Sequence, residues 1–442
     1  MKRTIAVVTS SRADYSHLYW PLKDLAAHAG VDLKLIVLAA HLSPQFGSTV
    51  EEIERDGLPI AARIECLLSS DTGIGMAKTL GLATLGLADA LAQLKPDLLL
   101  LIADRYEMLA PASVALTLRI PIAHIEGGEI SEGAIDDAVR NALTKLAHLH
   151  FTSTHTARAR VIAMGEEPWR VHRAGAPSLD HLRRSTLLTR NQLEAALGLP
   201  LTGPITVVAY HPVTLLPNHT AEAEALFKAL EHLALKQQDH QTQQSQSSQQ
   251  AHQTQRAQQS QQTQRTQQAQ EAQQSRQTHQ SQHTPGHILF CYPNADAGSY
   301  ALMDRIHAFC LRHPNARLFV NLPAITYWSL LREATLLLGN SSSGIMEAAS
   351  FHLPVVNIGL RQHGRERGPN ILDAAIPPGD PDPAPILHQI AKATNPAFRQ
   401  RLLPHENLYG DGHASNRIVE VLTTTPLEHL LHKHAQPLPD PA

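Results

Sequence analysis

This 442-residue sequence has few cysteines, few aromatic residues and no large surplus of either charge, and its apolar runs are short. The three cysteines, Cys66, Cys291 and Cys310, lie far apart without CxxC spacing, which argues against a disulfide framework or a zinc site. Lys and Arg number 37 against 40 Asp and Glu, so the formal charge of -3 leaves no broad footprint for nucleic acid or an anionic membrane. Any anion must be bound locally.

Apolar runs are too short for a membrane span, which needs about 18 residues or more. The apolar stretch after Lys2 and Arg3 ends at polar Ser10, unlike that of a signal peptide, so we expect a protein of the cytoplasm. HExxH, GxSxG, GxGxxG and Walker A motifs are also missing, and no metal-ligand spacing is visible. We therefore expect no metal and no cofactor.

Short, continuously apolar segments do occur, at residues 4–10, 32–39 and 96–103. Such segments are typical of parallel strands that are buried on both faces. Helical patterns separate them, one of them over residues 17–29, and further strands are indicated at 120–126 and 149–154. This alternation predicts a doubly wound α/β sheet, and we assign residues 1–182 to one Rossmann-like domain.

The pattern restarts at residues 204–214 and predicts a second Rossmann-like domain over 183–412. A last helical stretch, within residues 413–433, could return to the first domain. Residues 236–285 are Gln-rich and cannot bury enough apolar area to offset their ordering entropy, so we expect a disordered insertion. Two such domains would bind a ligand in the cleft between the carboxyl ends of their strands.

Polar clusters follow four of the expected strands. Arg12, after Ser10 and Ser11, is placed to meet an anion at a helix start, although an exposed arginine is the alternative. Asp104 and Arg105 follow the third strand, where they form either a simple salt bridge or part of a site.

The stretch IEGGEISEGAIDDA, residues 125–138, contains five carboxylates: Glu126, Glu129, Glu132, Asp136 and Asp137. Acids at a helix start complement the helix dipole, which explains one or two of them. It does not explain Glu126 at a strand end beside Asp104, because two converging acids repel unless a positive or protonated group is near. A carboxylate-rich pocket is therefore predicted.

In the second domain, LLLGNSSSGIMEAASF runs from a strand into Ser341, Ser342 and Glu347. Hydroxyl and backbone N–H groups gather there, which favours a phosphate cradle over an ordinary serine cap, with Glu347 able to reach ribose hydroxyls. Arg361 lies in a glycine-rich loop, and His211 follows another strand. A diphosphate site in one domain and acids in the other suggest nucleotide-sugar chemistry.

In order and spacing, TSSRADY, ADRYE, HIEGGEISEGAIDDA, GAPSLD, YHPVT, NADAGS, GNSSSGIMEA and NIGLRQHGRERGPN resemble the hydrolysing UDP-N-acetylglucosamine 2-epimerases of sialic acid biosynthesis. The resemblance covers residues 4–425 apart from the Gln-rich segment. It implies a GT-B-like pair of domains, a homo-oligomer (dimer or tetramer) and no nicotinamide cofactor. The implied reaction converts UDP-N-acetylglucosamine and water into UDP and N-acetylmannosamine, by anti elimination to 2-acetamidoglucal and hydration.

The resemblance also implies residue roles. The acid/base candidates are Asp104, Glu126 and Asp136, and His211 matches a histidine near the sugar and the diphosphate. The positions that match UDP contacts are Arg12, Asn294, Ser341, Ser342, Glu347 and Arg361, and Arg105 is assigned to the same site. Ser10 departs from the family, which often has glycine there, and its hydroxymethyl group could crowd the diphosphate.

Three alternatives stay open. The same reaction could act on UDP-2,4-diacetamido-2,4,6-trideoxyglucose for legionaminic acid synthesis, which would require an apolar pocket for a methyl group. A GT-B glycosyltransferase would use the same UDP cradle but would also need an acceptor groove. A sugar-nucleotide sensor without activity would be expected to lack one of the three acids, and all three are present.

Overall fold

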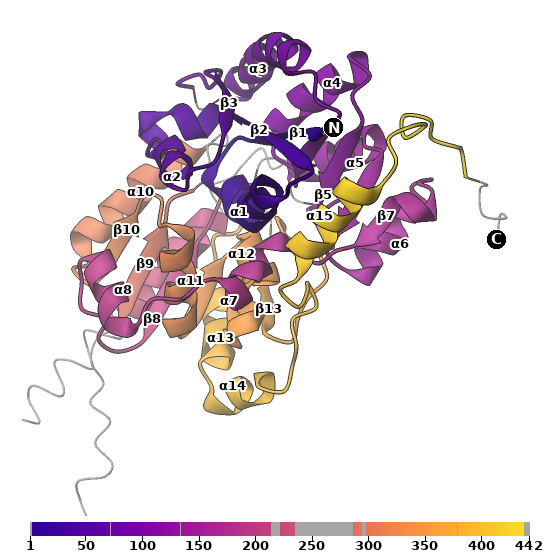
Figure 1. Ribbon diagram of the computed structural model, residues 1–442. Helices are drawn as coiled ribbons and strands as arrows, with labels where there is room; N and C mark the ends of the chain where they lie inside the picture. Colours follow the sequence, from indigo (N-terminus) through magenta and orange to yellow (C-terminus); the bar gives the residue numbers. More distant parts are fainter. Residues whose placement is uncertain are drawn as a thin grey trace, which may run out of the picture.

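The computed structural model describes residues 2–70, 72–132, 134–213, 222–234, 286–293, 298–377 and 379–436. Two parallel sheets, each flanked by helices, form two lobes (Figure 1). The expected α/β architecture of two Rossmann-like domains is therefore confirmed. The Gln-rich residues 236–285 and the candidate Asn294 lie outside the described residues.

The first sheet has the strand order β3-β2-β1-β4-β5-β6-β7, with every pair parallel. Its strands are β1 (Arg3–Thr9), β2 (Val31–Leu38), β3 (Ile60–Ile64), β4 (Leu98–Ile102), β5 (Ile122–Ile125), β6 (Leu149–Thr152) and β7 (Val171–Arg173). The order reverses between β1 and β4, and open sheets bind ligands where it does so. Arg12 and Asp104 follow these two strands.

The second sheet repeats this arrangement in the order β10-β9-β8-β11-β12-β13. Its strands are β8 (Ile205–Ala209), β9 (His287–Cys291), β10 (Ala316–Phe319), β11 (Leu336–Gly339), β12 (Val355–Ile358) and β13 (Ile371–Ala374). The switch point lies between β8 and β11, which His211 and Ser341 follow in the chain. Both switch points thus present polar residues to the space between the lobes.

Helices cover both sheets. They are α1 (Arg12–Ala27), α2 (Val50–Arg55), α3 (Gly73–Leu94), α4 (Leu109–Thr117), α5 (Ile135–Leu146), α6 (His155–Ala163), α7 (Asp180–Arg184), α8 (Arg190–Leu197), α10 (Ser299–Arg312), α11 (Ala324–Glu333), α12 (Ser342–Met346), α13 (Ala384–Ala393), α14 (Pro396–Leu402) and α15 (Ala414–Thr424). Residues 222–234 are also helical. Helix α7 spans the domain boundary that the sequence predicts at residues 182 and 183.

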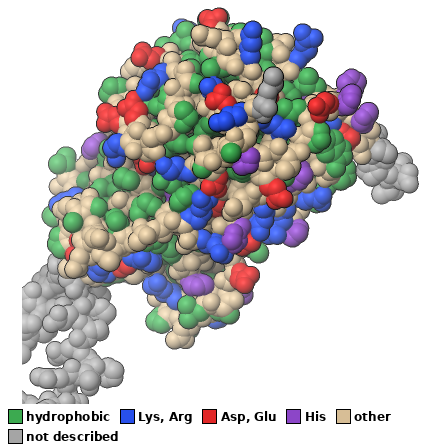
Figure 2. Space-filling model, in the orientation of Figure 1, with side chains coloured by type: hydrophobic (Ala, Val, Ile, Leu, Met, Phe, Trp, Pro, Cys, Tyr) green, Lys and Arg blue, Asp and Glu red, His purple; other side chains and the backbone are tan. Residues whose placement is uncertain are grey.

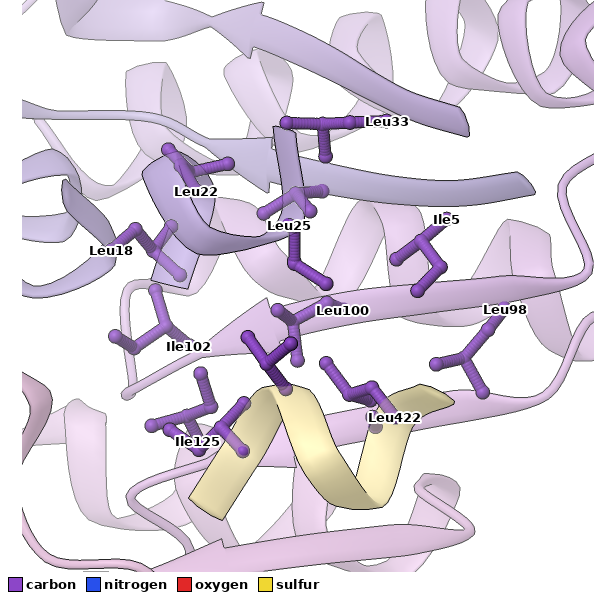
Figure 3. Packing of buried hydrophobic residues seen from close by; sticks show 14 of the residues in the cluster. Ile5, Leu18, Leu22, Leu25, Leu33, Leu98, Leu100, Ile102, Ile125 and Leu422 are labelled. Atoms are coloured by element: carbon purple, nitrogen blue, oxygen red, sulfur yellow. The ribbon is translucent and has the colours of Figure 1, made fainter. Parts of the chain in front are cut away.

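The last helix, α15, packs on the first lobe beside α1, where Figure 1 shows it in yellow. Figure 3 shows Leu422 of α15 meeting Leu100 and Ile125 of the sheet in one buried cluster. The Arg3 guanidinium also donates to the carbonyl of Thr425 at 2.9 Å. The end of the described chain thus contributes to the core of the first domain.

Helix α3 is long and apolar enough to cross a membrane by length and composition. Its buried residues, Gly75, Thr79, Ala83, Leu87 and Leu91, recur every four positions and so lie on one face. That stripe belongs to the core of the first sheet, together with α4. The pattern is that of a helix covering a sheet.

On the face drawn in Figure 2, acidic and basic side chains are interspersed.

The structure corrects one boundary that bears on the site. Helix α1 begins at Arg12 and not at residue 17, because the Ser11 side chain caps it by accepting from the Asp14 backbone N–H at 3.4 Å. The apolar period alone starts later, since the first turn carries polar residues. Arg12 is therefore the first helical residue, not a loop residue.

Candidate active site

Of the polar residues that follow β1, Ser10 bonds within the first domain and Arg12 bonds to the second. Ser10 is buried and donates to the Asp14 carboxylate, from its backbone nitrogen at 3.0 Å and from its hydroxyl at 2.6 Å. Its hydroxymethyl group is thus held by the helix start. Arg12 reaches the other lobe, where its Nη1 donates to the carbonyl of Leu322 at 3.1 Å.

Two residues at the ends of neighbouring strands adopt a left-handed backbone conformation. Ala103, after β4, has φ 57°, and Glu126, after β5, has φ 66°. Backbone N–H groups of both residues donate across the sheet, to Ile125 at 2.9 Å and to Phe151 at 2.7 Å. Such conformations cost about 1–3 kcal/mol each and cluster at functional sites. The sheet thus holds two strained turns where Asp104 and Glu126 emerge.

Asp104, Glu126 and Asp136 line one cavity, which is open to solvent. Four arginines line it with them: Arg105, Arg140, Arg361 and Arg365. Two of these pair directly with the acids. Arg140 contacts Asp104, and Arg361 Nη2 from the second domain lies 3.2 Å from Asp136 Oδ2. The basic groups that the sequence argument required beside the converging acids are therefore present.

The other three carboxylates of the Gly-rich stretch have structural roles. Glu129 is buried, accepts from the Ser153 hydroxyl at 2.8 Å and lies 3.7 Å from Arg365 Nε. Asp137 accepts from the Ser131 backbone N–H at 2.8 Å, and Glu132 pairs with a histidine of the other lobe. The helix-start explanation thus holds for Asp137, and two of the five acids, Glu126 and Asp136, reach the cavity.

Arg105 lines the acid cavity but bonds to Glu107, with 3.0 Å between Nη2 and Oε1. Burial of the Glu107 side chain raises the pKa of its carboxyl, against the opposing effect of Arg105. The ion pairs of this segment thus join Arg105 to Glu107 and Asp104 to Arg140, and not Asp104 to Arg105 as in the salt-bridge alternative. Asp104 belongs to the cavity, while the Arg105 guanidinium is engaged in a buried ion pair.

A second cavity adjoins the first and is lined mostly from the second domain. It brings together the predicted residues Arg12, His211, Ser341, Ser342, Glu347 and Arg361. Glu347 is the residue after α12, closer to the helix end than the sequence indicated. Burial alone would raise the pKa of Glu347, but hydrogen bonds from His17 and Ser343 lower it below its usual value.

The floor of this cavity depends on Asn340 and Gly339. Asn340 Oδ1 accepts from the His211 backbone N–H at 2.7 Å, and its Nδ2 donates to the His211 carbonyl at 2.9 Å. Gly339 has φ 142°, and a Cβ there would lie 2.0 Å from the carbonyl oxygen of Ala209. Only glycine allows β11 to approach β8 so closely before the serine turn.

His17, which the sequence argument did not single out, lies where the two cavities meet and lines both. Three further residues also line both cavities: Ala13, Ser342 and Arg361. The sequence argument missed His17 because it placed the start of this helix too late. Since α1 begins at Arg12, Ala13 and His17 both lie in the helix, four residues apart and on one face. In the described part of the chain, no group of three or more His, Cys, Asp or Glu could hold a metal.

Comparisons with known proteins agree with this arrangement. The family model described as UDP-N-acetylglucosamine 2-epimerase matches residues 23–247 and 251–423. The chain is 32% identical to the GDP/UDP-N,N'-diacetylbacillosamine 2-epimerase (hydrolyzing) of Campylobacter jejuni, covering 98% of both chains. It is 33% identical to the UDP-N,N'-diacetylbacillosamine 2-epimerase (hydrolyzing) of Legionella pneumophila, covering 97% of both.

Among solved structures, the UDP-GlcNAc 2-epimerase of Neisseria meningitidis bound to UDP-GlcNAc is similar, with a TM-score of 0.71 and 16% identity. The match covers 95% of this chain and 99% of that one. At this identity the likeness bears on the fold alone, and it supports the two-lobed architecture.

Proposed function

The chain belongs to the hydrolysing UDP-sugar 2-epimerase family, and we propose that it converts UDP-N-acetylglucosamine and water into UDP and N-acetylmannosamine. One observation carries the proposal: an acid-lined cavity and a serine-lined cavity adjoin between the two domains. The second cavity offers hydroxyls and Arg361 to a diphosphate, and the first offers carboxylates to the attached sugar.

In the proposed complex, Arg12, Ser341, Ser342 and Arg361 contact the diphosphate, and Glu347 contacts the ribose. His211 lies near the sugar and the diphosphate. Asn294 and Arg105 are proposed as further contacts of UDP. Cationic and hydroxyl donors at the diphosphate stabilise the charge that develops as UDP leaves.

The reaction begins with departure of the diphosphate, because the proton on C2 of the sugar is not acidic in water. The bond between C1 and the UDP oxygen breaks, and its electron pair leaves with UDP. A carboxylate takes the C2 proton, and the electrons of that C–H bond form the C1–C2 double bond of 2-acetamidoglucal. Water then adds its oxygen to C1 and gives one of its protons to a carboxylate, while a second, protonated group returns a proton to C2 from the opposite face.

We assign the central proton transfers to Asp104 and Glu126, with Asp136 in support. Asp104 and Glu126 emerge from adjacent strands at strained turns, so their carboxylates are set by the sheet and not by mobile loops. Asp136 is held by Arg361, which also lines the nucleotide cavity. Pre-set geometry of this kind is what proton transfer at carbon requires.

A second candidate substrate is UDP-2,4-diacetamido-2,4,6-trideoxyglucose, also called UDP-N,N'-diacetylbacillosamine. It is favoured by the two relatives that match over nearly the full length of both chains, since both carry this sugar in their names. The same two cavities and the same proton transfers would serve either sugar. Comparison of kcat/KM for the two UDP-sugars decides between them.

The setting of the reaction is proposed from the same family resemblance. N-acetylmannosamine would feed nonulosonic (sialic) acid synthesis, and the corresponding product of the second sugar would feed legionaminic acid synthesis. We place the reaction in the cytoplasm and propose a dimer or tetramer, which sedimentation equilibrium would measure.

Incubation of the purified protein with each UDP-sugar in D2O tests the proposal. UDP release together with deuterium at C2 of the freed sugar is the expected result. Asp104→Asn and Glu126→Gln should each retain UDP binding and lose on the order of 100-fold or more in kcat. Glu132→Gln is the matched control, because this acid belongs to the same loop, is exposed and lies outside the cavity. Released sugar without deuterium at C2 would exclude the mechanism, and normal rates in both variants would exclude the assigned acids.

A further inference from the structure

The side chain of His17 bridges two buried carboxylates that belong to different domains. Its Nδ1 lies 2.8 Å from Glu126 Oε1, and its Nε2 lies 3.4 Å from Glu347 Oε1. The histidine side chain is 17% exposed, and each carboxylate side chain is 5% exposed. The Nδ1 contact with Glu126 is a hydrogen bond, and the Nε2 contact with Glu347 is within ion-pair distance. A protonated imidazole in this place lies between two carboxylates.

Each of the three candidate acids in the sugar cavity has its own basic partner. Asp104 has Arg140, Asp136 has Arg361, and Glu126 has His17. Among these partners, the imidazole alone can change charge near neutral pH, because the guanidinium groups stay protonated. Glu126 is thus the acid whose charge state depends on a titratable neighbour.

The surroundings of His17 favour its charged form. Burial lowers the pKa of His17, but the charges and hydrogen bonds of Glu126 and Glu347 raise it well above its ordinary value. His181 of α7, whose own pKa burial lowers to about 4, and Asp14 on the same helix, which Ser10 engages, also lie nearby. The cavities that His17 lines contain further charged groups: Arg12 of α1, Asp104 and Arg105 after β4, Asp136 and Arg140 of α5, and Arg361 and Arg365 after β12. Two acids therefore face His17 from β5 and α12, and His181 is neutral at working pH.

We infer that His17 is a positioning residue for the epimerase reaction proposed above: it keeps the Glu126 carboxylate ionised and directed into the sugar cavity, and it links that carboxylate to Glu347 in the nucleotide cavity. The inference rests on the proposed function, since it assigns Glu126 to proton transfer. His17 acts through Glu126 and needs no contact with the sugar.

Removing the imidazolium leaves the buried carboxylates of Glu126 and Glu347 without the histidine that lies between them. Buried carboxylates without a nearby cation disfavour ionisation, so the pair would hold its two negative charges less readily at neutral pH. The turnover number should fall, and the acidic limb of the kcat profile should move to higher pH. UDP affinity should change little, because the diphosphate contacts remain.

Steady-state kinetics of His17→Gln and His17→Lys across pH test this role, beside UDP titration calorimetry. For His17→Gln we expect kcat to fall about 100-fold with KM and UDP affinity within about threefold, and the acidic limb to shift upward. His17→Lys restores a cation and should recover at least about tenfold of the loss. His155→Gln, an exposed histidine of α6, is the control.

The outcomes separate the two proposals. A wild-type enzyme without UDP release overturns the proposed function and the inference that rests on it. An active wild type overturns the inference alone in any of three cases: His17→Gln keeps kcat within about threefold, loses activity through KM and UDP affinity, or shows an unshifted pH profile. A lysine variant no better than the glutamine variant overturns it as well, because charge would then not be the operative property.

Discussion

Replacing Glu166 with glutamine should loosen the attachment of the C-terminal segment to the first domain. The Glu166 side chain is fully buried, and three donors converge on it: Lys145 at 2.5 Å, Lys433 at 2.8 Å and His150 Nε2 at 3.1 Å. Lys433 belongs to the last described residues of the chain, where Arg170 also donates to the carbonyl of Leu430 at 2.8 Å. One carboxylate thus joins β6, α5 and the segment that follows α15.

The magnitude follows from the pKa of this group. Burial would raise the pKa of Glu166, but the donated hydrogen bonds from His150, Lys145 and Lys433 lower it from 4.5 to about 2. A lowering of that size corresponds to about 3 kcal/mol in the free energy of unfolding at neutral pH, where the carboxylate is ionised in both the folded and the unfolded state. Because the folded pKa lies below the unfolded one, the contribution is complete above pH 4.5 and falls as the pH drops toward 2. Near pH 3.5 about 2 kcal/mol should remain.

Urea unfolding of wild type and Glu166→Gln at a series of pH values measures this contribution. Trp169 lies beside the segment, with its Nε1 donating to Glu167 at 3.1 Å, and its fluorescence reports on the region. We expect the variant to be less stable by about 2–3 kcal/mol at neutral pH and the difference to narrow below pH 4.5. A difference that stays constant down to pH 3.5, or one smaller than about 0.5 kcal/mol, would refute the reasoning.

Two further substitutions, Gly339→Ala and Arg140→Met, test the framework of the site, and Gly81→Ala is the control for the first. Gly339→Ala should cost at least about 3 kcal/mol, measured as lost soluble protein and lower unfolding free energy, because the added Cβ meets backbone at 2.0 Å. Gly81→Ala, in an exposed turn of α3 with open space, should instead stabilise by up to about 1 kcal/mol. Arg140→Met should cost about 3–5 kcal/mol in urea unfolding, because it leaves Asp104 without its cation. Stability within about 1 kcal/mol of wild type would show that the pair contributes little.

Much of the fold could be predicted from the sequence because central parallel strands are apolar on both faces. The segments at 4–10 and 32–39 overlap β1 and β2 in all but their first residue, and the segment at 96–103 contains β4. The edge strands β3, β7 and β13 were not predicted. They have three to five residues, and each contains charged or polar side chains, as in IAARI and VHR, because one side of an edge faces solvent. Strand order could not be read either, since periodicity carries no information on neighbours.

The candidate site was predictable to the extent that strand ends mark it. Asp104 and Glu126 line the acid cavity, Ser341 lines the nucleotide cavity, and Arg361 lines both. They could be predicted because parallel strands bring their carboxyl ends to one edge of a sheet. His17 was not predictable in the same way, since its role depends on where α1 begins and on Glu347 approaching from the other domain. Sequence spacing also could not sort the five acids of the Gly-rich stretch, because their partners lie far along the chain.

Counter-charges from the second domain reach several acids of the first domain. The carboxylates of Glu129, Glu132 and Asp136 all come from the first domain, and each is matched from the loop after β12, by Arg365, His363 and Arg361 respectively. A cluster of acids on one sheet would repel and take up protons in the absence of these groups. Since Arg361 also lines the nucleotide cavity, the loop that neutralises the acids is the loop that meets the diphosphate. Of the three candidate acids, Asp136 thus takes its cation from the second domain, whereas Asp104 and Glu126 pair with Arg140 and His17 of the first domain.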